Sequence, residues 1–317
     1  MKIYIENLRY KIVVFLLSIT YAFFLSNLKI DAFKDRENYF VYASNSWDIL
    51  NANLSQSIIG TLSNEPLWLL VNSILSLFLI PENVVRCLIF FSSFITAYFL
   101  LNISPKNIIF LILILIFPQV IKNYIIHLRQ GVALAIFILG WFSVNNNKKI
   151  LFFLLAPFIH TSFFFIITLL GFSYLIKRMR LNYDVGMVFY ILISLFLGLN
   201  LTYISSFFKA RQAETYAFTA DNISGLGFIF WIFILLTYLV EGRSFIQKNI
   251  ISINFLVFYL VLYFFVEVSG RIFESVTVFV LMSGIFLTGL RKVLFLSGFI
   301  FYLFFSFYLG SWNQWLI

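Results

Sequence analysis

Apolar runs, separated by short polar turns, occupy almost the whole chain. They lie at about 10–28, 66–80, 84–103, 107–126, 131–143, 150–175, 183–206, 225–241, 250–266, 271–289 and 292–311. Most are about 17–25 residues long, which is the length that a helix needs to cross a bilayer core of about 30 Å. The pattern predicts an all-α, polytopic integral membrane protein with about ten or eleven transmembrane or half-membrane helices.

Two long stretches interrupt this pattern with polar residues. Residues 29–64 and 207–224 hold many of the acidic side chains, and we expect them to form two longer loops. No remaining stretch is long enough for a soluble domain, so the chain is expected to form a single membrane domain over 1–317.

Composition identifies the lipid bilayer as the partner of most of the surface. Hydrophobic residues make up 62% of the chain and charged residues only 11%, whereas a soluble domain has roughly 25% charged residues. The net charge of +9 is spread over short turns. It forms no basic face of the kind that nucleic-acid binding requires, which excludes a nucleic-acid partner.

Cysteine and histidine are too rare for a disulfide or a typical metal cluster. Cys87 is the single cysteine, and His127 and His160 are the two histidines. The sequence also shows no clear cluster of acidic residues for a divalent cation. We therefore expect neither a metal nor a cofactor.

Basic residues indicate how the chain is oriented. Lys2, Arg9 and Lys11 precede the first apolar run, and no small-residue cleavage site follows it. This favours an uncleaved first helix with a cytoplasmic N-terminus in the bacterial inner membrane. If each run crosses once, Lys and Arg are commoner in the cytoplasmic turns, and both polar stretches lie in the periplasm. Chemistry is therefore expected at the periplasmic face.

Two of the runs have a second possible path. The run at 107–126 contains Pro118, and the run at 150–175 contains Pro157 and His160. Each run either crosses the membrane or turns back as two half-helices, which is tolerated where the break lines a protein cavity. Two hairpins would place Arg129 near His160 at the floor of a periplasmic cavity. The charge bias is equal for both topologies and leaves both open.

Ionisable groups at membrane depth are costly and are usually functional. Five places qualify: Asp35 to Tyr39, Glu65 before Pro66, His127 to Gly131, His160 to Ser162, and Glu267 with Arg271 and Glu274. Most have a structural alternative, such as a solvated loop for Asp35, a helix-dipole contact for Glu65, a core histidine for His160, and an i,i+4 ion pair for Glu267 and Arg271. Arg129 is the hardest to explain structurally, because its permanent charge requires an anion.

These segments resemble one known family. The strings DRENYFVYA at 35–43, EPLW at 65–68, LRQGVALA at 128–135 and PFIHTSFFF at 157–165 are similar to the EpsG family, and RIFE at 271–274 fits the same pattern loosely. The family includes many Wzy-type O-antigen and capsule polymerases. Each motif is short, and the specificity lies in their order and spacing over about 31–275.

The resemblance implies a membrane glycosyltransferase at the periplasmic face. In that family, a growing glycan on undecaprenyl diphosphate is transferred to a sugar hydroxyl of the next lipid-linked repeat unit. Both lipid-linked glycans are therefore expected partners. A chain-length regulator protein is a further candidate partner, because the family commonly works beside one.

Such a reaction requires a carboxylate to accept the acceptor's proton and cations to stabilise the departing diphosphate. Asp35 and Glu65 are the candidate bases. The candidate diphosphate ligands are Arg36, Arg129, Arg271 and His160, and arginine suits phosphate through its bidentate fork. Tyr39, Gln130 and Glu274 complete the set as candidate substrate-binding residues.

Two other functions remain open at this point. A membrane sugar O-acyltransferase could use His160, although the cytoplasmic turns are too short for an obvious acyl-donor site. A lipid-linked-oligosaccharide flippase or another transporter would usually place charges along a path between repeated halves. No such repeat is visible in the sequence.

Overall fold

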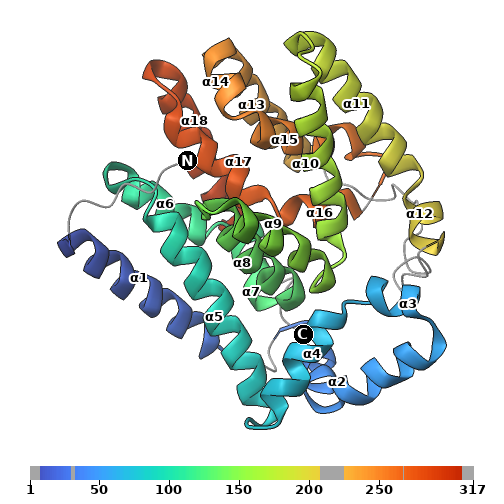
Figure 1. The fold of residues 1–317 in the computed structure, drawn as a ribbon. Helices are drawn as coiled ribbons and strands as arrows, with labels where there is room; N and C mark the ends of the chain where they lie inside the picture. The colour runs from blue at the N-terminus through green and yellow to red at the C-terminus, as the bar shows by residue number, and fades with distance from the viewer. Residues whose placement is uncertain (1–7, 30–32, 208–224, 267, 309–317) are drawn as a thin grey trace. The chain divides into compact units, whose positions relative to one another are not determined.

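The computed structural model describes residues 8–29, 33–207, 225–266 and 268–308, and over these residues it contains helices and no β-strand (Figure 1). The apolar runs predicted from the sequence coincide with these helices, which confirms the all-α fold. Among the described residues, three single helices are long and apolar enough to span a membrane, or five spans if each of two bent helix pairs counts as one. The chain is therefore a membrane protein, and the expected total of ten or eleven spans stays a prediction.

The chain divides into two compact units, with the change between Phe163 and Phe164. The single membrane domain expected over 1–317 stays a prediction. The helices of the first unit are α1 (Leu8–Ser26), α2 (Arg36–Gln56), α3 (Ile58–Ser63), α4 (Pro66–Ser76), α5 (Pro81–Leu101), α6 (Ile108–Leu115), α7 (Pro118–Ile125), α8 (Leu128–Phe142) and α9 (Asn146–Leu155), with 3-10 turns at Pro105–Asn107 and Ala156–Phe158.

Helix α5 is the central element of the first unit. It packs against α1 and α8, and it also contacts α2, α4 and α7. Its buried face includes the hydroxyls of Ser92 and Ser93, which donate to backbone carbonyls of the preceding turn at 2.6 Å. A hydroxyl that is satisfied within its own helix can be buried, and small residues let neighbouring helices approach closely.

The polar stretch at 29–64 is helical over most of its described part, so the prediction of a long loop there was wrong. Tyr39, Tyr42, Ala43 and Ser46 are buried at helical spacing along one face of α2, which packs on α4 and α5. This face contains aromatic and small residues rather than aliphatic ones, which explains why the stretch resembles a loop in the sequence. The second expected loop, at 207–224, lies outside the described residues beyond Phe207.

Both runs with an internal proline break near that proline, which was one of the two alternatives that the sequence left open. Helices α6 and α7 meet at a bend of 61°, and Pro118 occupies the first turn of α7, where its missing N–H has no cost. The second run breaks at the 3-10 turn Ala156–Phe158, before α10 (Ser162–Arg178). Whether either run crosses the membrane or returns stays a prediction.

The second unit contains most of α10 and then α11 (Tyr183–Leu199), α12 (Leu201–Phe207), α13 (Gly225–Glu241), α14 (Arg243–Lys248), α15 (Ile250–Leu262), α16 (Val268–Glu274), α17 (Thr277–Ser283), a 3-10 turn at Gly284–Phe286 and α18 (Gly289–Tyr308). Helix α15 packs against α11, α13, α16 and α17. The ring of Tyr259 stacks on Phe273 with centroids 4.1 Å apart, and Trp231 meets Phe273 edge-on. Aromatic packing therefore joins α13, α15 and α16.

Candidate active site

The candidate site begins at Glu65, the residue before α4. Its backbone is left-handed, with φ 59° and ψ 51°, and its side chain makes no capping hydrogen bond to its own helix. A residue before proline disfavours the right-handed helical region, so Pro66 prevents α4 from starting earlier. A left-handed conformation costs roughly 1–3 kcal/mol for a residue other than glycine and is often found at functional sites. Here it leaves the carboxylate free to contact other helices.

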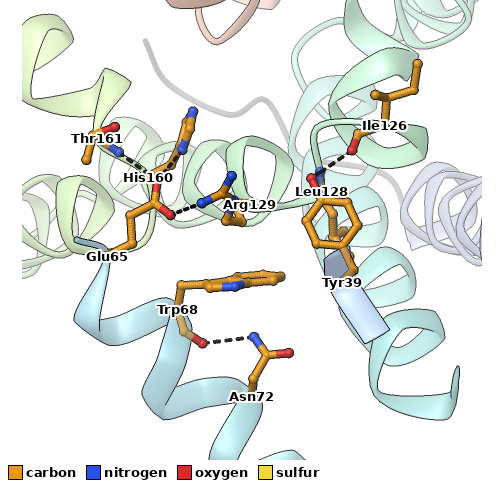
Figure 2. A network of polar contacts seen from close by, with 9 residues as sticks. All are labelled: Tyr39, Glu65, Trp68, Asn72, Ile126, Leu128, Arg129, His160 and Thr161. Carbon is orange, nitrogen blue, oxygen red and sulfur yellow. Dashed lines mark hydrogen bonds and ion pairs between the residues drawn. The ribbon is translucent and has the colours of Figure 1, made fainter. Parts of the chain in front are cut away.

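Both carboxylate oxygens of Glu65 have partners from distant segments (Figure 2). Oε2 accepts from Nη1 of Arg129, in the first turn of α8. Oε1 lies 2.7 Å from Nδ1 of His160, and the backbone N–H of Thr161 approaches the same oxygen at 3.4 Å. We call Glu65, Arg129 and His160 the Glu65 cluster. The structure brings Arg129 and His160 together on this carboxylate, whereas the paired-hairpin topology from which their proximity was expected stays a prediction.

The path of α8 and α9 explains why these two residues meet. The two helices pack side by side and are joined by the short turn at 143–145. Helix α8 leads away from Arg129, and α9 with its 3-10 turn leads back to His160 over a similar length at about 1.5 Å per residue. Arg129 and His160 therefore lie at the same end of this helical pair, opposite the turn.

The Glu65 cluster is largely buried. The side chain of Glu65 is 6% exposed, that of His160 14% and that of Arg129 21%. Burial alone would raise the pKa of Glu65, but Arg129 and His160 outweigh it and lower this pKa to about 2. Glu65 is therefore an anion at neutral pH.

Tyr39 holds the backbone just before Arg129. Its hydroxyl donates to the carbonyl of Ile126 at 2.8 Å and accepts from the N–H of Leu128 at 2.9 Å, across the junction of α7 and α8. The role expected for Tyr39, binding a sugar hydroxyl, is untested. Its observed contacts position the first turn of α8, and hence Arg129.

Aromatic rings of α2 and α4 support the same turn. Trp68 is buried and meets the rings of Tyr39 and Tyr42 edge-on, with centroids 5.9 and 6.2 Å away. The guanidinium of Arg129 lies 5.4 Å from the centroid of the Tyr42 ring. A cation over an aromatic face is attracted by about 0.5–2 kcal/mol. The aromatic residues of the DRENYFVYA and EPLW motifs therefore form a wall beside Arg129.

Gly131 brings α7 and α8 together. A Cβ atom at this position would lie 2.3 Å from the backbone oxygen of Asn123, so no larger residue fits without a shift. The preceding residue, Gln130, was expected to bind a sugar and is buried at 2% exposure. The close approach of α7 and α8 therefore explains why the LRQG motif has a glycine at this position. The sugar-binding role of Gln130 stays a prediction.

The other residues predicted near α2 lie at its first turn. Asp35 is exposed, and its φ of 64° is also left-handed. Arg36 is 2% exposed and its Nη2 donates to the carbonyl of Tyr124 at 3.4 Å. In the described part of the chain, its Nε and Nη1 have no hydrogen-bond partner. Buried donors usually find partners, so Arg36 retains capacity for an anion.

The remaining predicted residues belong to the second unit. Arg271 and Glu274 lie in α16, with Arg271 exposed and Glu274 partly buried. Their relation to the Glu65 cluster stays a prediction. Glu267, which was grouped with them, lies outside the described residues. Among the described residues, no group of three or more His, Cys, Asp or Glu side chains could hold a metal ion.

Sequence reasoning missed one polar cluster in the second unit. Oε2 of Glu241 pairs with Nε of Arg291 at 2.7 Å, and Oε1 accepts from the hydroxyl of Thr288 at 2.7 Å. The available sequence signal is the glycine that follows each of two cluster residues. Gly242 follows Glu241 and Gly289 follows Thr288, and both glycines have positive φ, which marks a change of chain direction at a helix end. This cluster ties the end of α13 to the start of α18.

The chain matches the sequence model of the EpsG family over residues 7–316. No curated protein and no solved structure matches it. The match spans the segments that contribute Tyr39, Glu65, Arg129 and His160. The family resemblance predicted from the motifs is therefore confirmed.

Proposed function

The chain belongs to the EpsG family, and from that premise we propose that it polymerises undecaprenyl-diphosphate-linked oligosaccharide repeat units at the periplasmic face of the inner membrane. The family match and the apolar helices make it a membrane protein of polysaccharide biosynthesis. The proposal adds the reaction: glycosyl transfer that yields O-antigen or another surface polysaccharide. The observation that carries it is the convergence of three short motifs, EPLW, LRQG and IHTS, on the Glu65 cluster.

The proposed reaction joins two lipid-linked glycans. A hydroxyl of the acceptor sugar attacks the anomeric carbon of the donor glycan, and the bond from that carbon to the lipid diphosphate breaks. The site must accept the hydroxyl proton and stabilise the negative charge that develops on the leaving diphosphate. The Glu65 cluster contains both kinds of group within hydrogen-bonding distance of one another.

Arg129 is the best-supported ligand for the diphosphate. Its guanidinium has five N–H donors, the bond to Glu65 uses Nη1, and the side chain keeps 21% exposure. The remaining donors suit two phosphate oxygens in a bidentate arrangement. Arg36, with two unpartnered nitrogens in the described part of the chain, is the second candidate. Arg271, which lies in the second unit, remains a candidate from the sequence alone.

Deletion of the gene tests the proposed function. We expect the surface lipopolysaccharide to carry a single repeat unit instead of a ladder on a gel, because only the polymerisation step is lost. Plasmid-borne wild-type protein should restore the ladder. The Glu65→Gln variant, which keeps the size of the side chain and removes its charge, should not restore it at equal membrane levels.

Glu241→Gln is the matched control. Glu241 also forms an ion pair with an arginine and accepts a hydrogen bond from Thr288, but it lies in the second unit and is not among the proposed site residues. This variant should restore the ladder. Loss of even the first repeat unit on deletion would indicate a flippase instead, and an unchanged ladder with altered acetylation would indicate an acyltransferase.

A further inference from the structure

The geometry around Glu65 makes this carboxylate a poor acceptor for the substrate proton. Oε2 is occupied by Arg129, and Oε1 is occupied by His160 and approached by Thr161. These same neighbours stabilise the ionised form and lower the pKa of Glu65 to about 2. A general base is most effective when its pKa is near the working pH. Glu65 therefore suits a positioning role better than the role of the base.

The contact with Glu65 fixes the tautomer of His160. An ionised carboxylate can only accept hydrogen bonds, so Nδ1 must carry the hydrogen that is shared with Oε1 at 2.7 Å. In a neutral imidazole, the other nitrogen then has a free lone pair. Figure 2 shows this second ring nitrogen on the side of the ring that faces away from Glu65.

The second nitrogen, Nε2, is available for a substrate. In the described part of the chain it has no hydrogen-bond partner, and the His160 side chain keeps 14% exposure. The charged or titratable groups that face this ring are Glu65 at the start of α4, and His127 and Arg129 at the start of α8. Burial and the positive charge of Arg129 favour the neutral ring over the imidazolium.

We propose that Nε2 of His160 is the general base of the transfer, and that Glu65 is the residue that positions it. This assignment rests on the proposed polymerase function. The acceptor hydroxyl gives its proton to Nε2 while its oxygen bonds to the anomeric carbon. The bond between that carbon and the diphosphate breaks, and its electron pair stays on the diphosphate oxygen. The imidazolium then returns its proton to water or to the released diphosphate.

Arg129 has two connected functions in this arrangement. Its charge keeps Glu65 ionised, so the carboxylate continues to hold the hydrogen of Nδ1. Its free donors face the negative charge of the diphosphate. His160, which the sequence suggested as a cationic diphosphate ligand, must instead be neutral before each transfer. As a neutral base, His160 predicts a polymerisation rate that falls on acidification. As a cationic ligand, it predicts a rate that rises.

The test measures polymerisation against pH with the purified full-length protein in lipid nanodiscs. The substrate is the lipid-linked single repeat unit extracted from the deletion strain. The base must be neutral, so the rate should be flat near neutrality and fall on acidification as the imidazole of His160 becomes protonated. A rate that rises on acidification would show that His160 acts as a cation. A rate that stays constant down to about pH 4 would assign the base to a carboxylate. Either result overturns the proposal.

Variants separate the base from the residue that positions it. His160→Gln should lower kcat/KM by roughly 100-fold or more. Its residual rate should lack the fall at low pH, which we call the acid limb. Glu65→Gln should lower kcat more than KM. It should also move the acid limb to lower pH, because the carboxylate that stabilises the imidazolium is lost. Exogenous imidazole should restore part of the activity of His160→Ala, which a purely structural role would not allow.

One control variant completes the test. His127→Gln removes the other histidine near the ring and should leave the acid limb in place. If the limb disappears in this variant, His127 is the titrating group and the assignment is wrong. The wild-type pH profile remains decisive even if a His160 variant fails to fold. Absence of any polymer from the wild-type protein would contradict the proposed function itself, whereas polymer with the wrong pH profile would contradict only the role of His160.

Discussion

Oε1 of Glu65 lies 2.7 Å from Nδ1 of His160, and the two residues are 95 positions apart in the chain. Each lies at a helix boundary, Glu65 before α4 and His160 between the 3-10 turn and α10. Helix boundaries leave backbone groups and side chains available for other partners. The site therefore depends on how α4, α8 and α9 are held together, and several predictions concern that scaffold.

Arg129 should be needed for both stability and activity. Arg129→Ala leaves Glu65 buried without its main counter-charge, which costs about 3–5 kcal/mol for a buried pair. We expect a lower melting temperature in detergent and no ladder. Arg129→Lys should recover stability better than polymerisation, because lysine keeps the charge and loses the bidentate geometry.

A double variant separates these two effects. Arg129→Gln combined with Glu65→Gln removes both charges, so the melting temperature should recover relative to Arg129→Gln alone. The ladder should remain absent. A double variant that polymerises normally would show that the ion pair is only structural.

Tyr39 should act through its hydroxyl. Tyr39→Phe keeps the ring beside Trp68 and leaves the carbonyl of Ile126 and the N–H of Leu128 without their partner. The cost should be about 1–3 kcal/mol, with a loss of activity because the turn before Arg129 is released. The matched control is Tyr238→Phe, which removes a buried hydroxyl bonded to the carbonyl of Val280 in the second unit. Both variants should lower the melting temperature, and only Tyr39→Phe should shorten the ladder at equal protein level.

The sequence identified the members of the site but not their arrangement. Arg129 stood out because a permanent charge beside an apolar helix needs an anion, and Glu65 and His160 stood out as ionisable groups at membrane depth. The pairing of Arg129 and His160 with Glu65 could not be derived, because it depends on contacts between helices. Tyr39 illustrates the same limit: its partners lie 87 and 89 positions away.

Prediction from the sequence succeeded where a single residue decides the local structure. It failed where the packing of a whole helix face decides it. The breaks near Pro118 and Pro157 follow directly from the missing N–H of proline. Helix α2 was predicted as a loop because its buried face contains Tyr39, Tyr42 and Ser46 in place of aliphatic residues. The burial of that face depends on α4 and α5, so composition alone could not reveal it.

Gly131 should tolerate no side chain. The Cβ atom of Gly131→Ala would meet the backbone oxygen of Asn123 at 2.3 Å, and separating α7 from α8 should cost about 1–3 kcal/mol. The start of α8 would move with it, so the ladder should also weaken. Gly171→Ala in α10 is the control, because a Cβ atom there meets nothing within 4 Å. Equal melting temperatures for the two variants would contradict the close approach.

The orientation of the site can be tested by thiol labelling. Because Arg129 and His160 lie opposite the turn between α8 and α9, a periplasmic site places Asn146 toward the cytoplasm. After Cys87→Ser, Asn146→Cys should react with a membrane-impermeant thiol reagent only once the inner membrane is opened. Ser55→Cys in the exposed part of α2 should react in intact cells. Labelling of Asn146→Cys in intact cells would rule out this orientation.

We propose above that the Glu65 cluster joins lipid-linked repeat units. The most direct measurement supplies the purified protein in nanodiscs with the lipid-linked single repeat unit and follows the products by mass spectrometry. We expect glycans of two or more repeats together with released lipid diphosphate from the wild-type protein and from Glu241→Gln. Glu65→Gln should give much less of both products, and Arg129→Ala should give neither above a trace. Equal product from Glu65→Gln and wild type, or no product from the wild type, would contradict the proposed site.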